Sequence, residues 1–188
     1  MAKRTAFFSP LSKVLFFLLL LLGGGLIWQN ANRESRFDPQ IRRAALKYDI
    51  SPALVKAVIW QESHFNPKAR GAVGEVGLMQ IRKLTAQEWC TDNKIKSFDP
   101  SHLLNPQTNI YIGSWYLSKM LKRYNKTDNP LPYALSDYNA GRKIVLKWSE
   151  GPAQTNSSLF LENITYPSTR RYVESVIRRS QHYQREFR

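Results

Sequence analysis

The segment 51–62 constrains the fold most, because it is an apolar helix that ends in a carboxylate. Ser51 and Pro52 are typical of an N-cap and of a proline in the first helical turn. The apolar residues that share one helical face with Glu62 are Leu54, Val55, Val58 and Ile59. An acid on the buried face of a helix costs free energy unless it serves a purpose. Glu62 is therefore the first candidate functional residue.

The position of Glu62 near the helix end allows two interpretations. In a cleft, the carboxyl would resist ionisation and keep its proton at neutral pH, as a general acid requires. At a frayed helix end, Glu62 would simply reach solvent. The position in the helix does not distinguish a cleft acid from a solvent-exposed helix end, and the motifs that follow in the chain are needed for that.

The chain beyond residue 38 is predicted to be helical, because no stretch shows the convincing alternation of a strand. We expect further helices to begin at Asp38-Pro39, at a capping box Thr85–Glu88, at Asn105-Pro106, at Leu131-Pro132 and at Ser168. The helix that starts at Leu131 should end at Gly141. The predicted fold class is all-α, preceded by an N-terminal hydrophobic helix.

The front of the chain predicts an export segment. Lys3, Arg4 and Lys13 precede an uncharged stretch, residues 14–28, that is rich in Leu and Phe. The predicted organisation is a signal or anchor at 1–30, a short tether at 31–38 and a folded domain at 39–188. The poor cleavage site near Ala31 favours a retained anchor in the cytoplasmic membrane, with the domain on the far side. A cleaved signal and a freely soluble domain are the alternative.

The formal net charge of +14 favours a polyanionic partner such as nucleic acid, an anionic membrane surface or an acidic wall polymer. Nucleic acid is disfavoured, because the charge is dispersed without a long basic run and the leader directs export. Cys90 is the single cysteine, so no disulfide can form within the chain. The histidines are too scattered for a metal site, and no cofactor is expected.

Three short segments combine acids, amides, glycines and aromatic residues in a specific order. They are Glu62–Pro67, Gly74–Ile81 and Tyr138–Gly141. In this order and spacing they resemble the soluble lytic transglycosylase (SLT) family, which has the goose-type lysozyme fold. The resemblance continues through Asn105-Pro106 and through residues 162–172, and it covers roughly residues 39–183.

The resemblance implies a lysozyme-like catalytic domain of the bacterial cell envelope, on the periplasmic or outer side of the inner membrane. The family cleaves the β-1,4 bond between N-acetylmuramic acid and N-acetylglucosamine in peptidoglycan glycan strands. Glu62 would protonate the bridging oxygen and then take a proton from the muramic acid C6 hydroxyl, which closes a 1,6-anhydro ring. Most glycosidases use a pair of carboxyl groups, whereas this scheme needs one.

The same resemblance assigns substrate-binding roles to six further residues. They are Met79, Gln80, Tyr138, Asn139, Glu162 and Tyr166. Gln80 would offer both a donor and an acceptor to an acetamido group. Taken singly, each of the six could instead be an ordinary core or surface residue. Together and in this order, they favour a glycan-binding cleft.

The sequence departs from the family pattern at four positions near the motifs, of which Lys83, in place of a common proline, has little mechanistic meaning. Gly71 replaces a serine that is thought to hydrogen-bond near the acid and the substrate. Glu75 stands where a small residue is usual, either as a solvated loop acid or as a second carboxylate that would shift the chemistry towards hydrolysis. Asp137 replaces an alanine, and we expect it to face solvent.

Three other functions remain open at this stage. A hydrolase of the goose-type lysozyme kind would cut the same bond with water. A non-catalytic peptidoglycan-binding scaffold would find its best support in Gly71, although Glu62, Gln80 and Tyr138 argue against it. A basic, membrane-tethered nucleic-acid binder is opposed by the dispersed charge and by the export segment. The sequence indicates no particular protein partner.

Overall fold

The computed structural model describes residue 16 and residues 32–188. Two units are distinguished, Met1–Arg36 and Phe37–Arg188. The predicted signal or anchor at 1–30 lies outside the described residues, except for Phe16. In the part that is described, no helix is long and apolar enough to cross a membrane.

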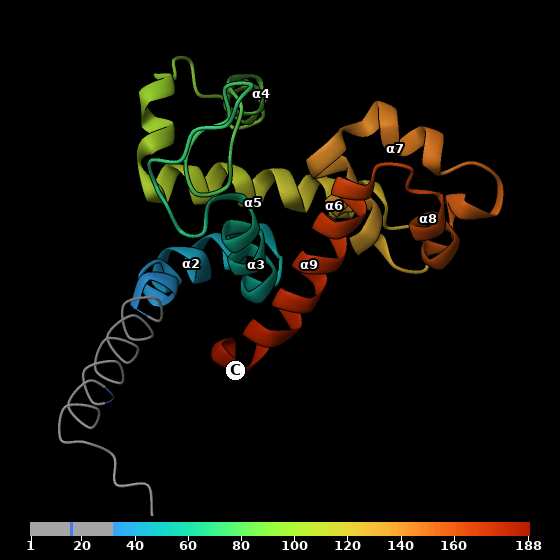
Figure 1. Cartoon of the computed structure of the whole chain (residues 1–188). Coiled ribbons are helices and arrows are strands. Elements are labelled where there is room, and N and C mark those ends of the chain that lie inside the picture. The colour runs from blue at the N-terminus through green and yellow to red at the C-terminus, as the bar shows by residue number, and fades with distance from the viewer. Residues whose placement is uncertain (1–15, 17–31) are drawn as a thin grey trace, which may run out of the picture. The chain divides into compact units, whose positions relative to one another are not determined.

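Every regular element in the second unit is a helix (Figure 1). The α-helices are α2 (Asp38–Tyr48), α3 (Pro52–Ser63), α4 (Lys83–Asp92), α5 (Pro106–Arg123), α6 (Pro130–Ala140), α7 (Arg142–Trp148), α8 (Ser157–Asn163) and α9 (Pro167–Tyr183). Short 3-10 helices occur at η1 (Pro100–Leu104), η2 (Gly151–Gln154) and η3 (Gln184–Phe187). Extended pairing among residues 32–188 is limited to isolated bridges of Val76 with Arg70 and Ile81. The all-α prediction is confirmed.

Helix α3 lies at the centre of the main core and packs against α2 and α9. All residues from Ala53 to Ile59 are buried, so the helix is enclosed on every face rather than on one stripe. Figure 1 shows α9 running diagonally from the group of α6, α7 and α8 to the lower end of α3. The long helix α5 packs against α2, α4 and α6.

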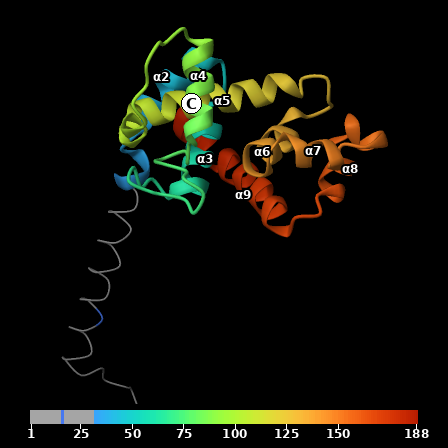
Figure 2. The ribbon, with the colours of Figure 1, turned by 90° about the horizontal axis from the view of Figure 1, so that it is seen from above.

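A second, smaller core holds α6, α7 and α8 together. Its buried members are Tyr133, Val145, Trp148, Ala153, Phe160 and Ile164. The ring of Tyr133 stacks between those of Phe160 and Tyr124, with centroid distances of 4.0 and 5.6 Å. Figure 2 shows the same three helices grouped to one side of α3 and α4. Because α6 also packs on α5 and α9, it joins this small core to the main one.

The helix starts were predicted with mixed success. Ser51 accepts a hydrogen bond from the Leu54 N–H, and Asn105 accepts one from the Thr108 N–H, as expected for N-caps. The predicted capping box at Thr85 is wrong. Ile81 forms a bridge with Val76, the next residue, Arg82, is extended and is the N-cap, and α4 begins at Lys83.

Two other predicted starts are corrected by prolines. Ser168 does not cap α9, because Pro167 already occupies the first helical turn and Tyr166 is the N-cap. Helix α6 begins at Pro130, one residue before the predicted start, and Asn129 caps it by accepting from the Leu131 N–H. Gly141 ends α6 as predicted.

Lys56 is fully buried on α3 and is paired with two carboxylates. Its ammonium lies 2.9 Å from Asp38 Oδ1 and 2.6 Å from Glu186 Oε2. The rings of Tyr183 and Phe187 lie on its other sides, at 5.0 and 5.5 Å. These contacts join both ends of the second unit to its central helix.

We expect Lys56→Ala to lower the free energy of unfolding by about 3 kcal/mol. Removing one partner of a buried pair costs about 3–5 kcal/mol, and the low end applies because Asp38 and Glu186 keep some contact with water. Urea unfolding followed by circular dichroism measures the change. The matched control is Lys126→Ala at an exposed turn position. Equal stability of the two variants would contradict the structural role of Lys56.

Candidate active site

A cavity of about 390 Å³ lies at the end of α3. It is lined by residues of α3, of the loop 64–82, of α4, of α5 and of α6. The lining residues are Glu62, Gly71, Glu75, Gln80, Ile81, Arg82, Thr85, Tyr116, Asp137, Tyr138, Asn139, Ala140 and Gly141. Segments far apart in the sequence therefore meet around Glu62.

Glu62 projects into this cavity from the last turn of α3, so the interpretation as a frayed, solvent-facing end is wrong. Burial raises the pKa of its carboxyl to about 7, against the opposing effect of a hydrogen bond from Tyr172, and the charge of Glu75 raises it further. The Tyr172 hydroxyl donates to Glu62 Oε1 at 2.7 Å. Near neutral pH, Glu62 can therefore both give and accept a proton.

The loop after α3 is held in an unusual backbone conformation. His64, Phe65 and Gln80 have φ values of 48°, 61° and 48°, in the left-handed region that non-glycine residues rarely adopt. Strain of this kind persists only when surrounding contacts impose it, and it is concentrated at functional sites. The loop thus places Gln80 at the cavity at an energetic cost.

Asn109 on α5 supplies much of the constraint on that loop. Its Oδ1 accepts from the Met79 N–H at 2.8 Å, and its Nδ2 donates to the carbonyls of Val76 and Leu103. A side chain at Gly77 would overlap the Asn109 amide, which explains the glycine there. From the other side, the Ser63 hydroxyl donates to the Leu78 carbonyl at 2.8 Å.

Two residues on α6 form the opposite wall. The Tyr138 hydroxyl donates to the Met79 carbonyl at 2.7 Å, which ties α6 to the loop. Asn139 Oδ1 accepts from the Thr169 hydroxyl at 2.8 Å, so the orientation of its amide is fixed by α9. Burial, together with the nearby charge of Glu62, raises the pKa of Tyr138 well above its usual value. Tyr138 is consequently a neutral hydroxyl at all physiological pH values.

The structure brings three of the six predicted binding residues, Gln80, Tyr138 and Asn139, to the cavity around Glu62. Met79 is fully buried instead, with its side chain packed against Gly113, and it meets the site only through its carbonyl. Consecutive side chains of the turn point in different directions, so Gln80 faces the cavity while Met79 faces the core.

Glu162 and Tyr166 are exposed and do not line this cavity. The Glu162 carbonyl accepts a hydrogen bond from Arg170 at 2.8 Å. The ring of Tyr166 packs edge-on against Trp148, with the centroids 5.2 Å apart. Both belong to the region of the small core, at the end of α8 and the start of α9.

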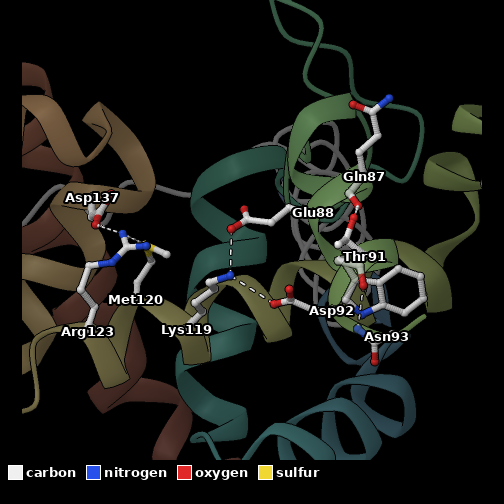
Figure 3. A network of polar contacts seen from close by, with 10 residues as sticks. Gln87, Glu88, Thr91, Asp92, Asn93, Lys119, Met120, Arg123 and Asp137 are labelled. Atoms are coloured by element: carbon white, nitrogen blue, oxygen red, sulfur yellow. Dashed lines mark hydrogen bonds and ion pairs between the residues drawn. The ribbon is translucent and has the colours of Figure 1, made fainter. Parts of the chain in front are cut away.

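Asp137 was expected to face solvent, and that expectation is wrong. The residue is 2% exposed, and its carboxylate accepts from Arg123 Nη1 at 2.5 Å (Figure 3). It also accepts from the Tyr124 hydroxyl at 2.8 Å. Helix α6 is covered by α5 on this side, and only the three-dimensional packing reveals that. The pair fixes α6 to α5 immediately before Tyr138.

A second polar contact in Figure 3 holds α4 over α5. Lys119 donates to Glu88 and Asp92 at 2.8 and 3.1 Å. Because Thr85 of α4 lines the cavity, this pairing helps to set the position of that wall. Within the described residues, no group of His, Cys, Asp and Glu is arranged to hold a metal ion.

The all-helical fold, with Glu62 as a cavity acid whose pKa is raised to about 7, is that of the lysozyme-like class. A model of the family described as "Transglycosylase SLT domain" matches residues 39–161. The chain belongs to this family.

Relatives include the soluble lytic murein transglycosylase of Salmonella typhimurium, 34% identical over 165 residues that are 85% of this chain and 25% of the relative. The membrane-bound lytic murein transglycosylase F of Desulfosudis oleivorans is 37% identical over 112 residues, 58% of this chain and 23% of the relative.

Among solved structures, the 70 kDa soluble lytic transglycosylase of Escherichia coli superposes with a TM-score of 0.72 at 30% identity, covering 87% of this chain and 26% of that one. A complex of the 70-kDa soluble lytic transglycosylase with bulgecin A gives a TM-score of 0.74 at 29% identity, with the same coverage of both chains. The chain thus spans about a quarter of the length of the soluble relatives that it matches.

We expect Tyr172→Phe to raise the pKa of Glu62 above its value of about 7. The phenol stabilises the ionised carboxylate, so its loss favours the protonated form. Titration of the glutamate side-chain carbons by 13C NMR measures the midpoint directly. Tyr166→Phe, outside the cavity, is the control and should leave it unchanged. A lower midpoint in Tyr172→Phe would contradict the assigned hydrogen bond.

Proposed function

We propose that this chain is a peptidoglycan lytic transglycosylase in which Glu62 is the single acid and base. The bond cleaved is the β-1,4 bond between N-acetylmuramic acid and N-acetylglucosamine, and the product carries a 1,6-anhydro end. The observation that carries the proposal is the half-buried Glu62 carboxyl, with a pKa of about 7, at the wall of the main cavity. The domain's membership of the SLT family supports the choice of substrate.

The chemistry follows from the two protonation states of Glu62. The protonated carboxyl donates its proton to the bridging oxygen, and the glycosidic bond breaks to give an oxocarbenium-like sugar. The carboxylate then removes the proton of the C6 hydroxyl, whose oxygen attacks the anomeric carbon. Water is not consumed, and Glu62 ends in its initial state. The hydrogen bond from Tyr172 stabilises the carboxylate between these two steps.

The predicted binding residues divide into two groups under this proposal. Gln80, Tyr138 and Asn139 contact the sugars beside the scissile bond, because they line the same cavity as Glu62. Since Thr169 occupies the Asn139 oxygen, the Asn139 amide nitrogen is the donor to the glycan. Glu162 and Tyr166 bind more distant sugars along the strand. Met79 contributes only its carbonyl, which holds the Tyr138 hydroxyl in place.

The hydrolase alternative also has an observation in its favour, because Glu75 places a second carboxylate at the cavity. A hydrolase would leave reducing ends, whereas the transglycosylase leaves anhydro ends. Mass analysis of muropeptides released from purified sacculi distinguishes the two. Release of no muropeptide would favour the scaffold interpretation.

The site of action that we propose is the bacterial cell envelope. The relatives include both soluble and membrane-bound murein transglycosylases. The basic leader and the uncharged stretch 14–28 support a retained anchor in the inner membrane, with the domain on the periplasmic or outer side. The net charge of +14 supports binding to an anionic wall or membrane surface.

We expect Glu62→Gln to reduce muropeptide release by at least about 10²-fold without loss of stability, because a glutamine cannot donate and recover the proton. Sacculi digestion followed by chromatography measures release, and urea unfolding checks the fold. Glu150→Gln, at an exposed position, is the charge-matched control. Normal release by folded Glu62→Gln would reject the assignment of Glu62.

We expect the exported protein to keep its N-terminus, since the leader lacks a convincing cleavage site near Ala31. N-terminal sequencing of protein purified from membranes tests this point. A mature start at or near Asn32, with the protein in the soluble fraction, would show that the leader is a cleaved signal.

A further inference from the structure

The space above Gly71 is occupied by the side chains of two other residues. A Cβ atom at Gly71 would overlap Glu75 Oε2 and would lie 3.0 Å from both Glu75 Cβ and Gln80 Oε1. The backbone of Gly71 is outside the left-handed region, so space rather than conformation excludes a side chain. Two acceptor oxygens, one from Glu75 and one from Gln80, therefore converge on a single point of the cavity wall.

The Glu75 carboxylate is firmly held at this point. Arg82 donates to its Oε1 through Nε at 2.9 Å and through Nη2 at 2.6 Å, and the Val73 N–H donates to its Oε2 at 3.1 Å. The Gly71 N–H also donates to the Glu75 carbonyl at 2.8 Å, which closes the loop between them. A carboxylate has about four acceptor sites, so these three bonds to its oxygens leave room for another donor.

The Gln80 amide is also held in a fixed orientation, with its oxygen towards Gly71. Its Nε2 donates to the Gly77 carbonyl at 2.8 Å, which directs its Oε1 towards Gly71. Both Glu75 and Gln80 line the cavity that contains Glu62. The wall beside the acid therefore presents one charged and one neutral acceptor to the same incoming group.

We propose that Glu75 and Gln80 form a donor-binding subsite above Gly71, where an amide N–H or hydroxyl of the N-acetylated sugar beside the scissile bond is bound. The assignment rests on the proposed function and deepens it. In this chain, the Gly71–Glu75 pair takes the place of the serine expected at position 71, with the carboxylate filling the space that the serine would occupy. Glu75 is a substrate-binding residue in this arrangement.

The charge state of Glu75 agrees with an acceptor role. Partial burial opposes ionisation, but the bonds from Arg82 and the backbone hold the pKa of Glu75 below its usual value. An ionised carboxylate accepts hydrogen bonds strongly, whereas its low basicity and its pairing with Arg82 make it a poor base for activating water. Its negative charge also raises the pKa of Glu62.

The test compares wild type with Glu75→Ala, Glu75→Gln, Gly71→Ser and the double variant Gly71→Ser/Glu75→Ala. On soluble glycan strands we expect Glu75→Ala to lower kcat/KM by about 10- to 100-fold, since a hydrogen bond to a charged group is lost. Glu75→Gln should lose less, because an acceptor remains. The alkaline limb of the rate should move to lower pH in both, because the charge that favours protonated Glu62 is gone.

The double variant gives the sharpest result. Gly71→Ser alone should lower kcat/KM, because the new side chain displaces Glu75. Together with Glu75→Ala it should return to within about threefold of wild type, because the serine hydroxyl then occupies the vacated space. Such strong non-additivity is expected of residues that are in contact or share one cavity, and not of independent sites. Glu150→Ala is the control and should match wild type.

Two results would overturn the subsite. One is a wild-type kcat/KM and pH profile in folded Glu75→Ala, and the other is simple additivity in the double variant. Reducing ends that disappear in Glu75→Ala would instead make Glu75 a base in hydrolysis. If wild type releases no muropeptide, the proposed function fails. The subsite is then tested by calorimetry, which compares the affinities of wild type and Glu75→Ala for an N-acetylglucosamine oligomer. Equal affinity of wild type and Glu75→Ala would then reject it.

Discussion

The burial of α3 is the constraint on which the rest of the structure depends. Because residues 53–59 are buried on all faces and the last turn is half-buried, the polar groups that the helix carries need partners from other elements. Lys56 finds Asp38 and Glu186, which fixes both ends of the unit to the core. Glu62 finds Tyr172 of α9 and the cavity. The ion pair and the reactive acid thus have the same physical origin.

The cavity itself is built from elements whose positions are set by polar contacts rather than by apolar packing alone. Asn109 holds the strained loop from α5, Tyr138 ties α6 to the same loop, and Asp137 fixes α6 through Arg123. Because contacts from other elements fix the loop backbone, side chains that face the cavity can be substituted in pairs. Gly71 and Glu75 are such a pair, because the Glu75 carboxylate occupies the space that a side chain at position 71 would need.

Predictions from local sequence were correct where the interaction involves only neighbouring residues. The caps at Ser51 and Asn105 need only a few neighbouring backbone groups, and both formed as predicted. Ser168 failed as a cap because the adjacent Pro167 already starts the helix. Asp137 failed because its partner Arg123 comes from another helix, and no nearby residue reveals that contact.

The sequence by itself determined the all-helical class, most of the long helices and the candidate acid, because helix periodicity, caps and motif spacing depend on neighbouring residues. The short helices α7 and α8 were not predicted. Only the tertiary structure decided which motif residues face the cavity. It placed Gln80 there and buried Met79, and it gave Glu75 a partner in Arg82. The physical reason is that the direction of a side chain in a loop depends on hydrogen bonds from distant elements, and burial, which sets the pKa of Glu62, exists only once those elements have packed.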